Sequence, residues 1–565
     1  MTTRLRRLTP SPIHEVDYQE TSFSIDALAR NICNTWEEAV INPAFDVVVI
    51  GGGMFGGYCA EKLFRGTKVK RTLLLEAGAF FLAEHYQNLP DIGLNVPDPT
   101  DPANDNGLPR ELVWGVPWRG NTSFVGTPYC VGGKSLFWGG WCPRLTDGDL
   151  AAWARDVAQY LKTNYGNVEK QLGVSESTDF IQGPLYEAML AKAKAVQPRV
   201  APLTAVEPPP LAVCGRGPAS GLFSFNKYSS LPLLISAIRD AIEEAGGDDS
   251  RRRLFLVPRA HVVKLHTSAG LVRRIEVFVN GQQRFLDIAP HSAVVLALGA
   301  IESTRIALES FPTTPNSAHE KMGRNLTVHM RSTTTAQLRR SVLESPGRPL
   351  REKLQTAAML VRGETRDGHF HLQITAADDR EGNSDKLLFR MIPDIDLLQE
   401  ILDAQDADFV AVTFRGFAET KGVKDQPIGN PALRWIDLSP FERDQFGFRR
   451  AFINLAISPA EARLWNAMDA ATVELARKLA REDDRAIRII SSSRDGLGTT
   501  YHESGTLWLG DYAATSVTDN NGRFHHVANA YCVDHALFPT VGSVNPALTG
   551  LTLTRKIAEH IANLK

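Results

Sequence analysis

Apolar and polar positions first form a regular pattern at residues 45–50, which read FDVVVI. Such a β-branched run is typical of a strand buried in a parallel sheet. A glycine-rich stretch, a helical pattern beginning at Tyr58 and a second apolar run at residues 71–75 follow. The order of strand, helix and strand predicts a βαβ unit at this point of the chain.

Apolar segments farther along the chain predict more strands. Four of them lie between residues 254 and 297 and read LFLVP, HVVKLHT, RRIEVFVN and AVVLALGA. Residues 331–499 contain alternating runs such as HFHLQITA and FVAVTF, which favour a separate antiparallel sheet with helices on one side. Helical spacing predicts one helix at residues 24–40, packed on the body of the protein, and an amphipathic helix at residues 545–564.

The length and composition limit the class of protein. A chain of 565 residues exceeds one ordinary core, so two domains, or one domain with a large insertion, are expected. The net charge of -2, without a long basic run, argues against nucleic-acid binding. No apolar run approaches the roughly 20 residues of a membrane helix, and the N-terminal arginines are not followed by the apolar stretch of a secretory signal. We therefore expect a cytoplasmic protein.

The cysteines and histidines do not predict a metal site. The six cysteines are scattered without a C-x-x-C pair, which indicates reduced and mostly buried thiols. His369 and His371 alternate on a predicted strand and are candidates to face a substrate. They have no third ligand at a clear spacing, so we predict no bound metal.

The strongest local signal is the stretch Gly51-Gly52-Gly53-Met54-Phe55-Gly56. It matches G-x-G-x-x-G between a strand and a helix, where its three glycines permit the tight turn, the approach of a pyrophosphate and close helix packing. The N–H groups that open the helix face the phosphates. Glu76 lies 20 residues after Gly56 at the end of the next strand, where a carboxylate can bind ribose hydroxyls. These features predict a dinucleotide site.

The glycine motif alone does not separate FAD from NAD, but the distribution of the other site-like segments favours FAD. These segments lie at residues 130–142, 293–305 and 500–550, far beyond one compact NAD unit. Over most of residues 45–565 the chain resembles the glucose–methanol–choline (GMC) oxidoreductases, and within them the branch that contains pyranose oxidase. The blocks that carry the resemblance are DVVVIGGGMFGG…LLLEAG, VGGKSLFW, VVLALGAIESTRIAL, MGRNLTVH, YHESGT and VDHALFPTVGSVNPALTGLTLTRKIAEHI.

The resemblance implies a fold with two domains. One is an α/β FAD-binding domain, Rossmann-like and discontinuous, and the other is an α+β substrate-binding domain with an antiparallel sheet. The expected FAD-binding segments are residues 45–150, 215–330 and 500–565, after an N-terminal arm at residues 1–44. Residues 151–214 form a first substrate or cap region, and residues 331–499 form the substrate-binding domain.

The resemblance also assigns cofactor contacts outside the glycine motif and Glu76. The backbone of Val262 and Val263 is expected near the adenine, and Pro546 near the pyrimidine end of the flavin. Phe137 stands where related proteins often carry a histidine linked to FAD, so noncovalent FAD is expected. The other expected contacts are Gly132, Gly133, Ser135, Trp138, Gly299, Asp534 and His535.

The resemblance further implies that His502 is the catalytic base and Asn545 its partner. A histidine suits proton removal because its pKa lies near operating pH, and an amide can donate to the developing alkoxide. His329 matches a recurring histidine that we interpret as structural. The expected reaction is oxidation of an alcohol group of a sugar, glycoside or polyol to a carbonyl, by hydride transfer to FAD.

Alternative functions remain open at this point. A lyase or isomerase of the same fold could use FAD without net redox chemistry, and a noncatalytic binding protein could keep the fold. The presence of both His502 and Asn545 argues against the binding protein. The sequence leaves open whether oxygen or another acceptor takes the electrons, and it does not give the oligomeric state.

Overall fold

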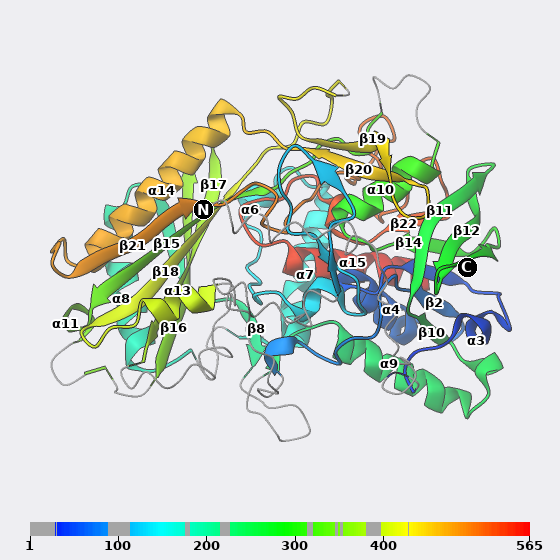
Figure 1. Cartoon of the computed structure of the whole chain (residues 1–565), viewed down its shortest axis with the longest axis horizontal. Coiled ribbons are helices and arrows are strands. Elements are labelled where there is room, and N and C mark those ends of the chain that lie inside the picture. Colours follow the sequence, from blue (N-terminus) through cyan, green and yellow to red (C-terminus); the bar gives the residue numbers. More distant parts are fainter. Residues whose placement is uncertain are drawn as a thin grey trace.

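The structure is a computed structural model built around two main sheets. It describes residues 29, 31–88, 113–175, 181–214, 226–312, 320–344, 349–350, 354–379, 397–427 and 429–564. A small parallel sheet with several helices occupies one end of the molecule, and a larger antiparallel sheet occupies the other (Figure 1).

The parallel sheet is assembled from distant parts of the chain. Its strands in spatial order are β10 (Leu254–Val257), β2 (Thr72–Leu75), β1 (Val47–Ile50), β14 (Ala293–Leu296) and β22 (Ala530–Cys532). All four pairings are parallel, and every residue in these strands is buried. The predicted βαβ unit is confirmed, with α4 (Met54–Gly66) between β1 and β2.

Helices pack around α4 next to this sheet. They are α7 (Arg155–Leu172), α9 (Leu231–Ala245) and α15 (Ala547–Ala562). The predicted C-terminal helix is confirmed as α15, but residues 547–554 are buried all round because α4 and α7 both pack against it. Gly550 of α15 leaves room for the Phe55 ring, which a Cβ there would meet at 2.5 Å.

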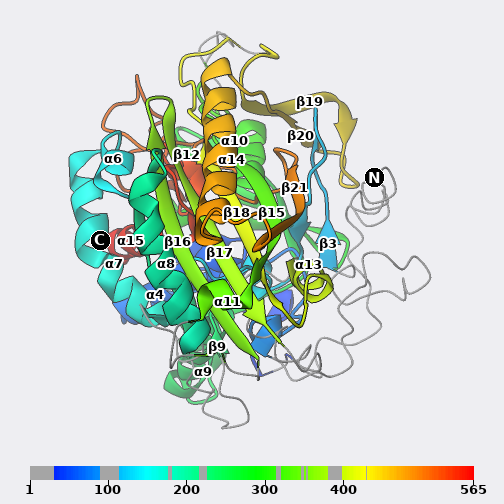
Figure 2. The ribbon, with the colours of Figure 1, turned by 90° about the vertical axis from the view of Figure 1, so that its left-hand side faces the viewer.

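The second sheet has six antiparallel strands, as the alternating pattern predicted. In spatial order they are β21 (Ile487–Arg494), β15 (His329–Arg339), β18 (Phe409–Glu419), β17 (Gly368–Asp378), β16 (Gln355–Thr365) and β7 (Leu203–Glu207). Helices α14 (Pro459–Leu479) and α8 (Pro184–Val196) lie along one face (Figure 2). The approach of α14 is close, since a Cβ at Gly416 would meet the Met468 sulfur at 2.8 Å.

Smaller elements complete the fold. The three-stranded sheets are β11 (Ala260–Ser268), β12 (Leu271–Val279) and β13 (Gln282–Asp287); β19 (Trp435–Arg443), β20 (Arg449–Asn454) and β4 (Arg119–Gly120); and β6 (Val174–Ser175), β8 (Leu211–Cys214) and β9 (Asn226–Lys227). The others are β3 (Trp114–Gly115) with β5 (Thr127–Pro128), α3 (Trp36–Val40), α6 (Asp147–Leu150), α10 (Ala300–Ser310), α11 (Arg340–Leu343) and α13 (Leu398–Asp403).

Two local predictions need comment. The four strands expected between residues 254 and 297 are confirmed, and β13, whose sequence QQRFLD is largely polar and exposed, was missed. The single helix expected at residues 24–40 is interrupted where the structure describes it, because Ala29 is helical, residues 31–32 form a turn and a separate helix, α3, begins at Trp36. Thr35 caps it there with Glu38 in a capping box, which fixes its N-terminus. Residues 24–28 and 30 lie outside the described residues.

The domain boundaries stay a prediction. No described strand from residues 331–499 belongs to the parallel sheet. The hairpin β19–β20 nevertheless packs against α10, directly after β14 of that sheet. Within the described ranges, no helix combines the length and apolar composition that a membrane span requires.

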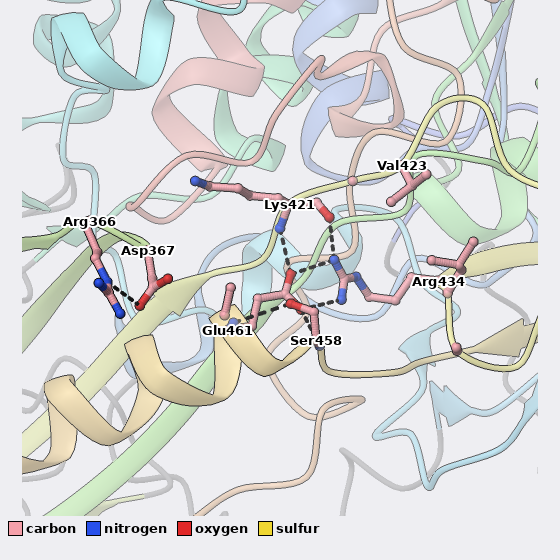
Figure 3. A pocket seen from close by; sticks show the side chains of 11 residues that line it. Arg366, Asp367, Lys421, Val423, Arg434, Ser458 and Glu461 are labelled. Atoms are coloured by element: carbon pink, nitrogen blue, oxygen red, sulfur yellow. Dashed lines mark hydrogen bonds and ion pairs between the residues drawn. The ribbon is translucent and has the colours of Figure 1, made fainter.

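A buried ion pair ties the start of α14 to neighbouring segments. It borders a surface hollow of about 430 Å³, in which the Arg434 guanidinium faces Glu461 (Figure 3). The two carboxylate oxygens of Glu461 accept from Arg434 at 2.7 and 2.9 Å. The same guanidinium also donates to the backbone carbonyls of Leu326, Ala456 and Lys421. One side chain therefore satisfies acceptors from four stretches of chain.

We predict that Arg434→Ala lowers the free energy of unfolding by about 3–5 kcal/mol, because Glu461 would remain buried without its cationic partner. The matched control is Arg463→Ala, which removes a half-exposed arginine paired with Asp367. That change should leave the free energy of unfolding almost unchanged, because solvent screens the pair. Urea unfolding of the two variants measures both values, and similar losses in the two would contradict the role given to Arg434.

Candidate functional site

Two glycine-rich turns meet at the carboxyl end of the parallel sheet. The first follows β1, and the second contains Gly132, whose N–H donates to the carbonyl of Gly52 at 2.8 Å. A Cβ on Gly133 would lie 3.0 Å from the Cα of Gly53, and Gly133 has a positive φ of 49°. The turns therefore touch through backbone, with no room for a side chain between them.

The first turn opens helix α4 without a side-chain cap. Its N-cap residue is Gly53, so no side chain occupies the N–H groups of the first helical turn, to which Met54 and Phe55 belong. A Cβ on Gly56 would lie 1.8 Å from the carbonyl oxygen of Gly51, so only glycine fits at this position. Uncapped N–H groups at a helix N-terminus suit a phosphate or another anion.

Glu76 binds the backbone of the first turn through its carboxylate. It directly follows β2 and accepts from the N–H groups of Gly52 at 2.6 Å and Gly78 at 2.8 Å. Burial raises the pKa of this carboxyl to about 7, although the backbone hydrogen bonds act in the opposite direction. The sequence thus placed Glu76 correctly at a strand end beside the glycine turn, while its contact with a ribose stays a prediction.

Asp534 and His535 follow β22 at the same edge of the sheet. Asp534 accepts from the Gly299 N–H at 3.0 Å and from the Ser303 hydroxyl at 2.5 Å, so its carboxylate holds the N-terminus of α10. The His535 ring lies edge-on to Phe55, with 5.3 Å between the ring centroids. Its Nδ1 is buried and has no hydrogen-bond partner among the described residues.

The remaining expected cofactor contacts are engaged within the protein or buried. The Ser135 hydroxyl donates to the Gly132 carbonyl at 2.6 Å, and the indole N–H of Trp138 donates to the Tyr228 carbonyl at 2.7 Å. Val262 and Val263 are buried in β11, and Pro546 is the N-cap of α15. Phe137 contacts the rings of Tyr86 and Trp114 and offers no atom for a covalent link.

His502 and Asn545, 43 positions apart in the sequence, lie together in the structure. The His502 Nε2 is 3.4 Å from the Asn545 amide nitrogen. On its other side, the His502 Nδ1 is 2.9 Å from Nδ1 of His329. The His329 Nε2 in turn is 3.0 Å from the carbonyl oxygen of Gly542. His329, which the sequence analysis interpreted as structural, therefore contacts the expected base directly.

A second branch reaches Asn545 from strand β17. The Gln373 side-chain N–H₂ donates to the Asn545 carbonyl oxygen at 2.6 Å and to Nε2 of His371 at 3.1 Å. The Nδ1 of His371 donates to the backbone carbonyl of Ser543. The sequence analysis named His371 but missed Gln373, although their spacing by two on a strand puts them on one face.

The surroundings of His502 favour its neutral form. Burial lowers its pKa well below the usual 6.5, and the nearby His329, His371 and Arg331 lower it further. Burial likewise lowers the pKa of His329 to about 4 and that of His371 to about 3. The Phe417 ring stacks on His371 and lies 5.5 Å from the His502 ring, which adds an apolar wall.

Asp149 anchors the loop that carries Asn545. Its carboxylate accepts from the N–H and hydroxyl of Ser543 at 3.1 and 3.2 Å, and from Thr146. The His369 Nδ1 lies 3.7 Å from Oδ1 of Asp149 and 3.3 Å from Oε1 of Glu419. One nitrogen or oxygen atom from each of these three side chains, of the kind that can bind a metal ion, lies within 4.8 Å of the other two. The two carboxylates escaped the sequence analysis because they come from distant segments.

Residues 422–554, which include His502 and Asn545, match the family model of the GMC oxidoreductases. Residues 422–554 thus carry a GMC oxidoreductase domain. Among solved structures, the chain is similar in fold to pyridoxine 4-oxidase from Mesorbium loti, with 15% identity and a TM-score of 0.55. The alignment covers 92% of this chain and 99% of that chain. No protein of curated function matches the sequence.

This domain indicates that the protein is an FAD-dependent oxidoreductase that acts on CH–OH groups. The residues present fit FAD. The uncapped start of α4 and the backbone contact between the glycine turns suit a pyrophosphate. The unpartnered Nδ1 of His535, buried against Phe55, can take a hydrogen bond from a bound group.

We predict that Glu76 makes the stability of the cofactor-free protein depend on pH. Because the folded protein raises this pKa from 4.5 to about 7, the folded state binds more protons between these values. Stability should therefore fall as the pH rises through this window, by at most about 3 kcal/mol. Glu76→Gln keeps an acceptor for one backbone N–H and should flatten this part of the profile. Parallel profiles for wild type and variant in urea unfolding would contradict the prediction.

Proposed function

We propose that this protein oxidises an alcohol carbon of a sugar, glycoside or polyol to a carbonyl, with His502 as the base. The observation that carries this proposal is the pairing of a buried, neutral His502 with the Asn545 amide. The two side chains belong to loops on either side of β22, and His535, shortly after this strand, contacts Phe55 of the first glycine turn. In open α/β sheets, ligands bind outside the carboxyl ends of the strands.

The two side chains divide the work at the substrate oxygen. His502 accepts the hydroxyl proton, and the Asn545 N–H₂ donates to the oxygen as negative charge develops on it. Bound FAD supplies the acceptor for the hydride that leaves the carbon. Proton loss to His502 would leave the negative charge on the substrate oxygen that favours departure of the hydride and formation of the carbonyl.

The position of the Gln373 side chain favours the proposal that the substrate has more than one hydroxyl. Its carbonyl oxygen is buried and has no hydrogen-bond partner among the described residues, next to the amide of Asn545. An unpaired buried acceptor costs about 1–3 kcal/mol, which a neighbouring substrate hydroxyl would recover. The structurally similar enzyme is named as an oxidase of pyridoxine. A substrate screen therefore includes pyridoxine beside sugars, glycosides and polyols.

We propose that the parallel sheet with its helices is the Rossmann-like FAD domain, formed by residues 45–150, 215–330 and 500–565. Residues 151–214 and 331–499 then supply the substrate side. The proposed cofactor contacts are those of the sequence analysis, with Asp534 acting through the start of α10. A cytoplasmic location and the absence of nucleic-acid and membrane partners also stay predictions, and oxygen or another acceptor reoxidises the flavin.

The decisive experiment is anaerobic flavin reduction by substrate. We predict that His502→Ala slows it by about 10²–10⁴, the usual worth of a general base, with FAD still bound. Asn545→Ala should slow it by less, since one such donor contributes about 3–4 kcal/mol at most. The wild-type rate should be constant at neutral pH and fall only well below pH 6.5, where His502 becomes protonated.

His291→Ala is the matched control, because His291 is an exposed histidine in a turn. It should reduce its flavin at the wild-type rate. If His502→Ala also does so with the best substrate found, His502 is not the base. Product formation while the flavin stays oxidised throughout would instead favour the lyase or isomerase.

We also predict that the FAD is noncovalent, because Phe137 has no nucleophilic atom for a link. Acid precipitation should release all flavin absorbance into the supernatant. Yellow colour that remains with the precipitated polypeptide would contradict this prediction. Phe137→His offers a comparison, since it restores the residue type that related proteins link to FAD.

A further inference from the structure

The hydrogen bonds around His502 determine where its single resting proton lies. A backbone carbonyl can only accept, so the contact between His329 Nε2 and the Gly542 carbonyl requires a proton on that Nε2. His329 is completely buried, and burial keeps it neutral, with one ring proton. Its Nδ1 therefore has no proton and accepts. The donor at 2.9 Å must be the Nδ1–H of His502.

We propose that His329 is a positioning residue that keeps the resting proton of His502 on Nδ1 and so leaves Nε2 unprotonated, as the acceptor for the substrate proton. This inference rests on the proposed function of His502. It assigns a chemical role to a histidine that sequence comparison alone marks as structural. Without His329, the His502 ring could carry its proton on Nε2, where it would face Asn545 and substrate as a donor.

The opposite end of the network gives the same assignment independently. The Ser543 carbonyl requires a proton on Nδ1 of His371, so the His371 Nε2 accepts from the Gln373 N–H₂. The Gln373 side-chain nitrogen also donates to the Asn545 carbonyl oxygen. The Asn545 N–H₂ must then point toward His502 Nε2, where it needs an acceptor at 3.4 Å. An unprotonated Nε2 is what both branches require.

The charged and titratable groups around His502 agree with this arrangement. His329 and Arg331 come from β15, His371 from β17, and His535 from the loop after β22. Each lowers the pKa of His502, so the ring carries only one proton at neutral pH. Which nitrogen carries it is then decided by hydrogen bonding, and His329 is the partner that accepts on the Nδ1 side.

Two substitutions separate this role from a structural one. In His329→Asn the amide oxygen takes the place of ring Nδ1 and can still accept from His502. In His329→Gln the longer amide takes the place of Nε2 and can still donate to the Gly542 carbonyl. If His329 sets the proton, anaerobic flavin reduction should slow by less than tenfold in the Asn variant and by about 10² or more in the Gln variant.

A merely structural His329 that holds the Gly542 loop predicts the reverse order, with the Gln variant the better enzyme. The reverse order, or equal losses in the two, would overturn the inference. Thermal unfolding and bound-FAD absorbance must show that both variants fold and hold cofactor. If His502→Ala itself reduces flavin at the wild-type rate, the proposed function fails, whereas normal rates in both His329 variants beside a slow His502→Ala refute only this inference.

A second measurement does not use activity. In oxidised, substrate-free holoenzyme labelled with ¹⁵N in the histidine rings, the His502 signals are identified by their loss in His502→Ala. We expect a protonated Nδ1 and an unprotonated Nε2 in wild type and in the Asn variant, and a protonated Nε2 in a fraction of the Gln variant. A protonated Nε2 in the wild-type enzyme would also overturn the inference.

Discussion

The chemistry of the site depends on the fact that a backbone carbonyl accepts hydrogen bonds and cannot donate them. The carbonyls of Gly542 and Ser543, adjacent in one loop, end the two branches of the network around His502 and Asn545. They fix the direction of every hydrogen bond between them, and with it the tautomers of the buried histidines. Asp149 holds the Ser543 end of this loop through two hydrogen bonds.

The site also depends on how the chain assembles its two sheets. The parallel sheet takes strands from residues 47–75, 254–296 and 530–532, so its carboxyl edge collects loops that are distant in the sequence. The antiparallel sheet supplies His329 at the first residue of β15, and His371 and Gln373 from β17. An isolated bridge between Thr327 and Ser504 joins the start of β15 to the His502 segment. The proposed catalytic residues His502 and Asn545 thus contact side chains of the antiparallel sheet.

Sequence patterns predicted the parts of the site that depend on local chemistry. The turn from Gly51 to Gly56 needs glycine because a Cβ at Gly51 or Gly56 would clash with nearby backbone. Glu76 could be predicted because it is the residue directly after strand β2. Asp149 and Gln373 could not be found this way, because their roles arise only when distant segments come together. The expectation of one continuous helix at residues 24–40 failed for a local reason, since a turn at residues 31–32 follows the helical Ala29 and the capping box at Thr35 starts a new helix at Trp36.

The role of His329 shows why a resemblance between sequences leaves part of the mechanism undetermined. A histidine that recurs in a sequence block can pack, bind cofactor or orient another ring, and spacing does not distinguish these roles. The contacts of His329 distinguish them, because its Nδ1 lies 2.9 Å from Nδ1 of His502 and its Nε2 faces the Gly542 carbonyl. Burial makes this orientation necessary, because the low pKa values leave each ring one proton to place. In the proposed mechanism, a neutral His502 ring is ready to act as the base, and the hydrogen-bond network leaves its Nε2 as the acceptor for the substrate proton.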